Sequence, residues 1–141
     1  MATRPMDSVT FATALTALDA SVRRAEELGV AVCVSVTDAA GHQLAFGRMD
    51  GAALMSGGIA TNKAYTVCAF NGLPTHQWFD LIKDEPALLH GIVHTDRLVV
   101  FAGGVPILVD GRLVGAVGCS GGSAEQDRAC AEAGAAAAAT A

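Results

Sequence analysis

Aromatic side chains and positive charges are both scarce in this chain of 141 residues. Only 5% of the residues are aromatic, and nine lysines and arginines stand against 14 aspartates and glutamates, which gives a net charge of -5. No run of Lys or Arg follows a phosphate backbone, so we expect no nucleic-acid partner. The longest apolar run, residues 98–109, is interrupted by glycine and proline and is too short to span a membrane, so we expect no membrane partner either.

Two further absences concern redox chemistry and export. The four cysteines lie far apart and form no C-x-x-C pair, which is typical of buried, reduced thiols and not of a zinc site. The first ten residues are polar and no apolar signal core follows them, which favours a cytoplasmic protein. A chain of this length can bury the core of one domain, so residues 1–141 are predicted to form a single unit.

The spacing of apolar residues predicts a mixed α/β (α+β) fold. Steps of three and four predict helices at residues 11–28 and 54–70, with shorter helical pieces over 74–90. A last helix is expected from Ser123, which forms a capping-box pattern with Gln126, and its alanine-rich end at 135–141 is expected to fray. Alternation and turn residues predict five antiparallel strands, at residues 30–37, 43–49, 98–102, 105–109 and 113–119.

Three charged residues are candidates for a ligand site. Arg48 shares a strand face with apolar neighbours, so it either extends to solvent or places a cation in a pocket. Asp50 precedes a glycine, where it either caps a turn or orients Arg48. Lys63 stands alone in a helix of small residues, so it either points to water or has been desolvated to bind a carboxylate or move a proton.

Glycine-rich segments form a second group of candidates. Gly103 and Gly104 lie between two predicted strands, and Ser120, Gly121 and Gly122 lead into the last helix. Backbone N–H groups before a capped helix can bind an anion, although tight turns and close strand packing need the same glycines. Neither a G-x-G-x-x-G nor a Walker pattern occurs, so a nucleotide is not favoured.

The four histidines offer acid–base groups but no metal motif. His90 and His94 have helical spacing without the acidic residue of a zinc-protease motif, so no metal site is predicted. His42 and His76 each stand beside another candidate segment and are the better general acid–base candidates, or else ordinary polar surface.

Several short motifs occur together in one order, and their combination is specific although each is short. In this combination the chain resembles the GlcG/HbpS-like family, which includes the carboxy-terminal domain of PduO-type proteins, over residues 15–136. The resemblance implies a profilin-like sandwich with a five-stranded antiparallel sheet, and a homo-oligomer between dimer and octamer. The motifs are V-S-V-T-D at 34–38 with Gly41, R-M-D-G-A at 48–52, I-A and K-A at 59–64, P-T at 74–75, G-G-V-P-I at 103–107, and V-G-A-V-G with S-G-G at 114–122 and Asp127.

The resemblance implies binding of haem or another tetrapyrrole, or of a different small molecule that carries a carboxylate. Arg48 and Lys63 would bind the carboxylates. Members that bind haem through a histidine near the first helix are not matched here, because no histidine precedes His42. The alternative is a cofactor-free isomerase, tautomerase or hydro-lyase acting on an oxo or enol acid, in which Lys63, His42 or His76 would move the proton. A subunit that only stabilises a partner is the third possibility.

Overall fold

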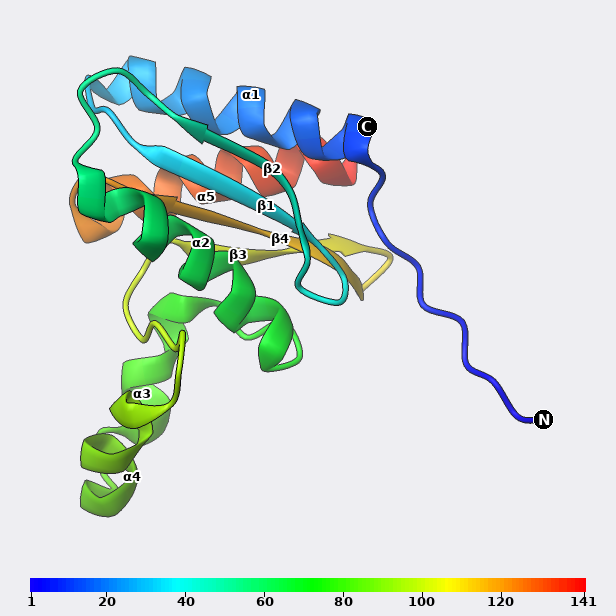
Figure 1. Ribbon diagram of the computed structural model, residues 1–141, viewed down its shortest axis with the longest axis vertical. Coiled ribbons are helices and arrows are strands. Elements are labelled where there is room, and N and C mark those ends of the chain that lie inside the picture. Colours follow the sequence, from blue (N-terminus) through cyan, green and yellow to red (C-terminus); the bar gives the residue numbers. More distant parts are fainter.

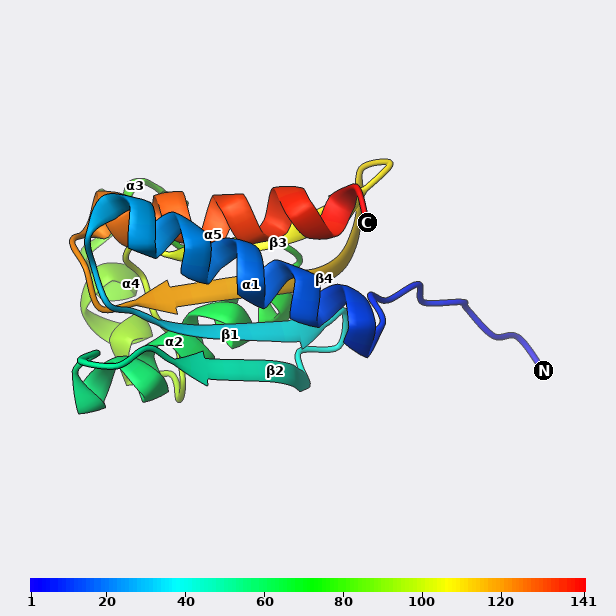
Figure 2. The same cartoon turned by 90° about the horizontal axis from the view of Figure 1, so that it is seen from above.

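The computed structural model describes residues 1–141 and contains one four-stranded antiparallel sheet between two layers of helices (Figure 1). Helices α1 and α5 lie side by side on one face, and α2 covers the other, as the view from above shows (Figure 2). No helix is both long and apolar enough to cross a membrane. The elements are α1 (Phe11–Leu28), β1 (Cys33–Asp38), β2 (Gln43–Arg48), α2 (Leu54–Ala69), η1 (Thr75–Gln77), α3 (Trp78–Ile82), α4 (Pro86–Gly91), η2 (Ile92–His94), β3 (Gly104–Val109), β4 (Arg112–Ser120) and α5 (Ala124–Ala139).

The strands are ordered β2-β1-β4-β3, so β2 and β3 form the two edges. Pro106 lies on the edge strand β3, where a missing backbone donor is tolerated. Asp110 and Gly111 both have positive φ, 52° and 75°, and close the β3–β4 hairpin as the sequence predicts.

The prediction of five strands is wrong at residues 98–102, since the sheet has four strands and none includes this segment. This segment forms no ladder, because a side chain of α2 binds its backbone instead. The Thr66 hydroxyl accepts a hydrogen bond from the Val99 amide at 3.0 Å, and its one proton lies between the Asn62 carbonyl at 2.7 Å and the Arg97 carbonyl at 3.2 Å. The segment therefore packs along α2 and joins the sheet only at Gly104.

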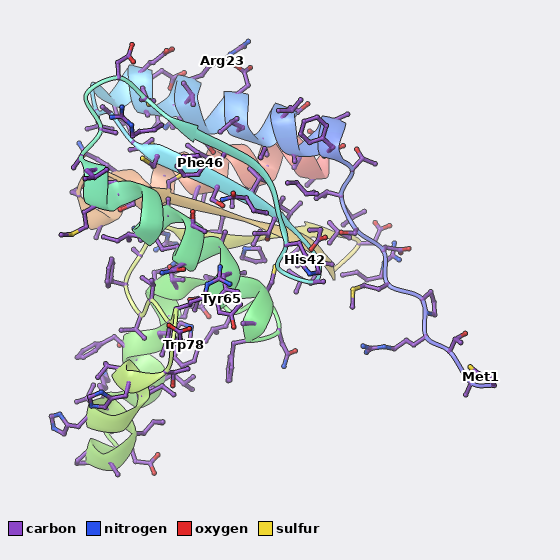
Figure 3. All side chains as sticks on the ribbon, in the orientation of Figure 1. Met1, Arg23, His42, Phe46, Tyr65 and Trp78 are labelled. Carbon is purple, nitrogen blue, oxygen red and sulfur yellow. The ribbon has the colours of Figure 1, made fainter.

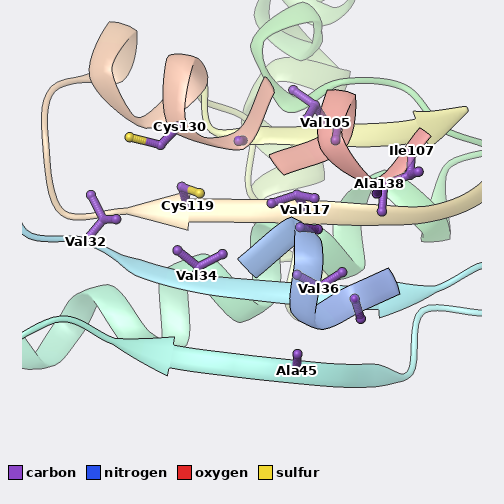
Figure 4. Packing of buried hydrophobic residues seen from close by; sticks show 14 of the residues in the cluster. Val32, Val34, Val36, Ala45, Val105, Ile107, Val117, Cys119, Cys130 and Ala138 are labelled. Atoms are coloured by element: carbon purple, nitrogen blue, oxygen red, sulfur yellow. The ribbon is translucent and has the colours of Figure 1, made fainter. Parts of the chain in front are cut away.

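The two faces of β1 divide the interior as the alternation predicts. Val34 and Val36 pack with Val117 of β4 under α1 and α5 (Figure 4). Cys33, Ser35 and Thr37 alternate with the valines on the opposite face of the strand, toward α2. Because helices cover both faces, nearly all of β1 is buried.

Helix α5 continues through Ala139, although fraying was expected from about residue 135. Ala135 and Ala138 are buried against the core, and the Cβ position of Gly134 lies only 2.2 Å from Ser21 Oγ of α1. The small side chains let α1 and α5 approach closely, and Ser21 donates a hydrogen bond to the Cys130 carbonyl at 2.8 Å. Packing against α1 and the core therefore keeps residues 135–139 helical, although their alanine-rich composition alone did not predict this.

Candidate functional site

Three side chains form a row at one end of the sheet, on the face toward α2. The strand register pairs Cys33 of β1 with Arg48 of β2 on one side and with Ser120 of β4 on the other. Cys33 and Ser120 are buried, while Arg48 is exposed at the open edge. Burial raises the pKa of the Cys33 thiol, which the nearby Arg48 charge only partly offsets, so the thiol stays protonated at neutral pH.

Arg48 keeps most of its hydrogen-bonding capacity free. One guanidinium nitrogen donates to the Ala52 carbonyl at 3.1 Å, and no carboxylate pairs with the side chain. Asp50, the predicted orienting partner, is exposed in the turn that follows and forms no ion pair. A guanidinium has five N–H donors, so Arg48 can still bind a carboxylate through two of them.

A hollow of about 280 Å³ lies between β2 and α2 and is lined by Phe46 but not by Arg48. We call it the β2–α2 groove. Phe46 lies two residues before Arg48 on the same face of β2, and the Cβ position of Gly57 is 3.4 Å from its ring (Figure 3). An apolar ring thus borders the depression, and a free cation stands two residues further along the same strand face. The groove is lined by Gln43, Phe46, Gly57, Gly58, Thr61 and Asn62.

Lys63 is placed apart from this groove and is completely buried. Its Nζ donates to the Asp127 carboxylate of α5 at 3.0 Å and to the Cys119 carbonyl of β4 at 2.8 Å. Burial lowers the pKa of Lys63 below its ordinary value, and the charge of Asp127 opposes that shift. Because α2 and α5 lie on opposite faces of the sheet, this pair ties the two helical layers together.

The predicted glycines make the room that Lys63 needs. A Cβ on Gly103, whose φ is 126°, would lie 2.6 Å from Lys63 Nζ and 2.5 Å from the Cys119 carbonyl oxygen. A Cβ on Gly104 would lie 2.7 Å from the Lys63 carbonyl oxygen. These two positions of the sequence-predicted site therefore surround the lysine stem and bring α2 onto the sheet.

The backbone amides in the turn before α5 also have a partner within the chain. The Gly122 amide donates to the second oxygen of the Asp127 carboxylate at 2.8 Å, while Ser120 and Gly121 connect this amide to the end of β4. Ser123 and Gln126 form the predicted capping box. At least one of the amides expected to bind an anion therefore already has the protein's own carboxylate as its partner.

The acid–base candidates lie in separate surroundings. His42 is exposed at the β1–β2 turn, with Nδ1 at 3.3 Å from Asp38 (Figure 3). His76 lies in η1, and burial, assisted by the charge of Arg128, lowers its pKa. Neither histidine hydrogen-bonds Lys63, whose two partners are given above. His90 and His94 are both exposed.

The roles of two residues were missed from the sequence. Asp127 belongs to the motifs of the family resemblance, but nothing identified it as the buried partner of Lys63, since its local signal was only its place in the first turn of a capped helix. Phe101 was not singled out either, although its ring lies 5.1 Å from Lys63 Nζ and covers the lysine from the solvent side, where the ring is half exposed.

Comparisons with known proteins agree with this architecture. The family described as haem degrading protein HbpS-like matches residues 9–136. An uncharacterized 15.0 kDa protein from the dhaT-dhaS intergenic region of Citrobacter freundii is 41% identical over 127 residues, which are 89% of this chain and 88% of that protein. Klebsiella pneumoniae protein ORFY superposes with a TM-score of 0.92 at 31% identity, over 100% of this chain and 97% of that chain. A PduOC–haem complex superposes with a TM-score of 0.83 at 36% identity, over 92% and 94% of the two chains.

Proposed function

Because the chain belongs to the HbpS-like family of haem-degrading proteins, we propose that it binds a small molecule carrying a carboxylate, with a tetrapyrrole such as haem as the first candidate. The observation that carries this proposal is Arg48, an exposed guanidinium without an acidic partner, on the same face of β2 as Phe46, which lines the β2–α2 groove. A relative of known structure is described as a haem complex, which supports testing haem first.

In this proposal Arg48 binds the carboxylate and Phe46 contacts the apolar body of the ligand. A charge-assisted contact of this kind contributes about 1.5–3 kcal/mol. Lys63 contributes no charge to the ligand in this proposal, because its ammonium group is buried and already paired with Asp127. The net charge of -5 makes Arg48 a local exception that favours anionic over neutral ligands.

The residues of one chain fit haem through its carboxylates and not through its iron. None of the four cavities has a histidine in its lining, and no group of three His, Cys, Asp or Glu side chains could hold a metal ion. A groove of 280 Å³ lies just below the range of about 300–1,000 Å³ typical of drug-sized ligands. A tetrapyrrole would therefore lie across the groove, and we assign no iron ligand.

The test is a titration followed by the Soret band, with haemin and haemin dimethyl ester as the two probes. We expect saturable binding of haemin, weaker binding of the ester, and a loss of about 2 kcal/mol of haemin affinity in Arg48→Ala. Arg23→Ala is the matched control, because Arg23 is an exposed arginine of α1, on the face of the sheet opposite α2 and the groove. Equal affinities of the wild type and Arg48→Ala would overturn the role of Arg48, and no saturable binding of haemin would exclude the tetrapyrrole.

A further inference from the structure

The largest cavity of the molecule lies outside the β2–α2 groove and has a volume of about 440 Å³. It lies at the end of the sandwich where the N-terminal segment enters α1, away from the arm formed by α3 and α4 (Figure 1). Four parts of the chain line it: residues 4–7, the β1–β2 turn, the end of α2 with the turn that follows, and the start of β4. We call it the Arg4 cavity.

The N-terminal segment is anchored to the sheet immediately after the residues that line the cavity. The Val9 amide donates to the Val114 carbonyl at 2.9 Å. The Ser8 hydroxyl accepts from the Ala39 amide, also at 2.9 Å. A Cβ on Gly115 would lie 3.0 Å from Val9 Cγ2, so this glycine leaves the space into which Val9 packs. The residues just before the anchor therefore form a wall of the cavity, although they belong to no helix or strand.

Arg4 lines the cavity with a guanidinium that has no partner in the chain. Of the nine lysines and arginines, only Arg4, Arg48 and Arg97 form no ion pair. Arg97 is held by a hydrogen bond and an aromatic ring, and Arg48 donates to a backbone carbonyl, whereas the Arg4 side chain makes no hydrogen bond. All five N–H donors of Arg4 are therefore available to a ligand.

A second arginine of the lining, Arg112, is paired with an acid of the same cavity. It forms an ion pair with Asp7, and both side chains are 58% exposed. An exposed pair of this kind contributes little free energy, because water and salt screen it. The pair also engages only one nitrogen of the guanidinium. An anion of higher charge can therefore replace the Asp7 carboxylate on Arg112 or share the guanidinium with it.

The rest of the lining suits an organic anion. Asn71 is exposed and its side chain makes no hydrogen bond within the chain, so its amide N–H groups can donate to an oxyanion. Burial raises the pKa of the Cys68 thiol, which therefore stays neutral and adds no negative charge to the lining. Met6 and Leu113 supply apolar contacts. The lining thus carries two positive charges and one negative charge, in a protein whose net charge is -5.

We propose that the Arg4 cavity binds a small organic molecule with a doubly charged oxyanion, a phosphate monoester or a dicarboxylate, whose oxygen atoms bind Arg4 and Arg112. The volume of 440 Å³ is within the range of about 300–1,000 Å³ typical of small-molecule sites, so the ligand has an organic body as well as its anionic group. Two guanidinium groups favour a dianion over a monoanion, because each can donate two parallel hydrogen bonds. The cavity shares no lining residue with the β2–α2 groove, so this proposal does not depend on the proposed function.

The test is isothermal titration calorimetry with phenyl phosphate and phthalate as the two dianions, at about pH 8, where a phosphate monoester carries two charges. Benzoate and benzamide have the same ring with one charge and with none. We expect saturable binding of at least one dianion, binding of benzoate that is about tenfold weaker or less, and no binding of benzamide. The tighter of the two dianions identifies the ligand class as a phosphate ester or a dicarboxylate.

Three substitutions of exposed side chains test the lining in two opposite directions. Arg4→Ala and Arg112→Ala should each weaken the tighter dianion about tenfold, because each removes a charge-assisted contact. Asp7→Asn should strengthen the same dianion about threefold or more, because it frees Arg112 and removes a negative charge from the cavity. A gain in affinity cannot result from a general loss of folding.

The exposed Arg23–Asp19 ion pair of α1 supplies the matched controls, because it does not line the cavity and its variants change the net charge by the same amounts. Arg23→Ala and Asp19→Asn should leave the affinity nearly unchanged, and so should Arg48→Ala. The proposal would be overturned by no saturable binding of either dianion or by equal binding of benzamide. Equal effects of Arg4→Ala and Arg23→Ala, or no gain in Asp7→Asn over Asp19→Asn, would overturn it as well.

Discussion

Lys63 illustrates how differently a single residue is interpreted before and after its partner is known. From the sequence, Lys63 either points to water or binds a carboxylate or moves a proton, and in each case Lys63→Met would leave the helix folded. The structure places the ammonium between Asp127 and the Cys119 carbonyl with no solvent exposure. A buried charge without a partner costs more free energy than a satisfied ion pair or an apolar pair. The structure therefore predicts that Lys63→Met, which leaves Asp127 without its cation, destabilises the protein.

We expect Lys63→Met to lower the free energy of unfolding by about 3–5 kcal/mol, because it leaves the Asp127 carboxylate buried with only the Gly122 amide as a partner. Urea unfolding followed by circular dichroism measures this loss. Lys83→Met is the control, since the exposed Lys83–Asp80 pair should contribute less than about 0.5 kcal/mol. A stable Lys63→Met protein with impaired ligand binding would restore the original interpretation.

His76 should make stability depend on pH. Its pKa is lowered from 6.5 by burial and by Arg128, so the folded state favours the neutral imidazole. The unfolded chain takes up a proton first as the pH falls, so the contribution to stability is complete above about pH 6.5 and is lost as the pH falls through the lower folded-state pKa. We expect His76→Gln to flatten this loss between about pH 7 and 5. Unfolding midpoints at several pH values test it, with exposed His94→Gln as the control, and identical slopes for the wild type and His76→Gln would contradict it.

At the scale of elements, the predictions that succeeded depend on local chemistry. Gly29 ends α1 with a φ of 71°, the Asp110-Gly111 turn closes the β3–β4 hairpin, and Ser123 caps α5. Each of these signals lies within a few residues of the boundary that it sets. They identified the main helices and four of the five expected strands.

The element predictions that failed depend on contacts between distant residues. The segment at 98–102 is not a strand because the Thr66 side chain, more than 30 residues away, binds its backbone. Arg48 could be placed at a strand end from the sequence. The pairing of Lys63 with Asp127 could not be predicted from the sequence, because the two residues are 64 positions apart. The glycines beside the lysine matter only because a Cβ there would clash with it in the folded chain.

The contact between α2 and the sheet gives a prediction at this scale. A Cβ on Gly118 would lie 2.2 Å from the Ala60 carbonyl oxygen and 2.6 Å from the Ala64 amide nitrogen. We expect Gly118→Ala to push α2 away from β4 and to destabilise the protein by about 1–3 kcal/mol or more. The check is the midpoint of urea unfolding.

Gly58→Ala is the matched control for Gly118→Ala. Gly58 lies in α2 itself, and nothing comes within 4 Å of its Cβ position. Alanine is the better helix former by about 0.5–1 kcal/mol, so this variant should be slightly stabilised. Similar effects of the two substitutions would mean that close packing at Gly118 does not limit the approach of α2.

For the whole molecule, the homo-oligomer that the family resemblance implies cannot form through an uncovered face of the sheet, because helices cover both faces (Figure 2). Apolar surface is instead exposed beside the open edge strand β2. Leu54 is 92% exposed, Met55 75% and Phe46 43%. Leu54 and Met55 form the first turn of α2, next to an edge whose backbone groups can still pair.

We therefore predict that the chain self-associates through the β2 edge and the start of α2. Sedimentation velocity at micromolar concentration should give a multiple of the 14.3 kDa chain mass.

Leu54→Glu should shift the distribution toward the monomer, because each copy in a two-fold contact would bury a charge against an apolar surface. Leu81→Glu, which charges an exposed leucine on the α3 arm, should leave the mass unchanged and serves as the control. A wild-type protein that sediments only as a monomer would exclude self-association, and equal effects of the two substitutions would place the contact elsewhere. Because Phe46 also lines the β2–α2 groove, an interface at this edge would bring a second copy to the border of that groove, on the strand that carries Arg48. In that case Leu54→Glu would weaken haemin binding together with association, whereas Arg48→Ala would weaken binding alone.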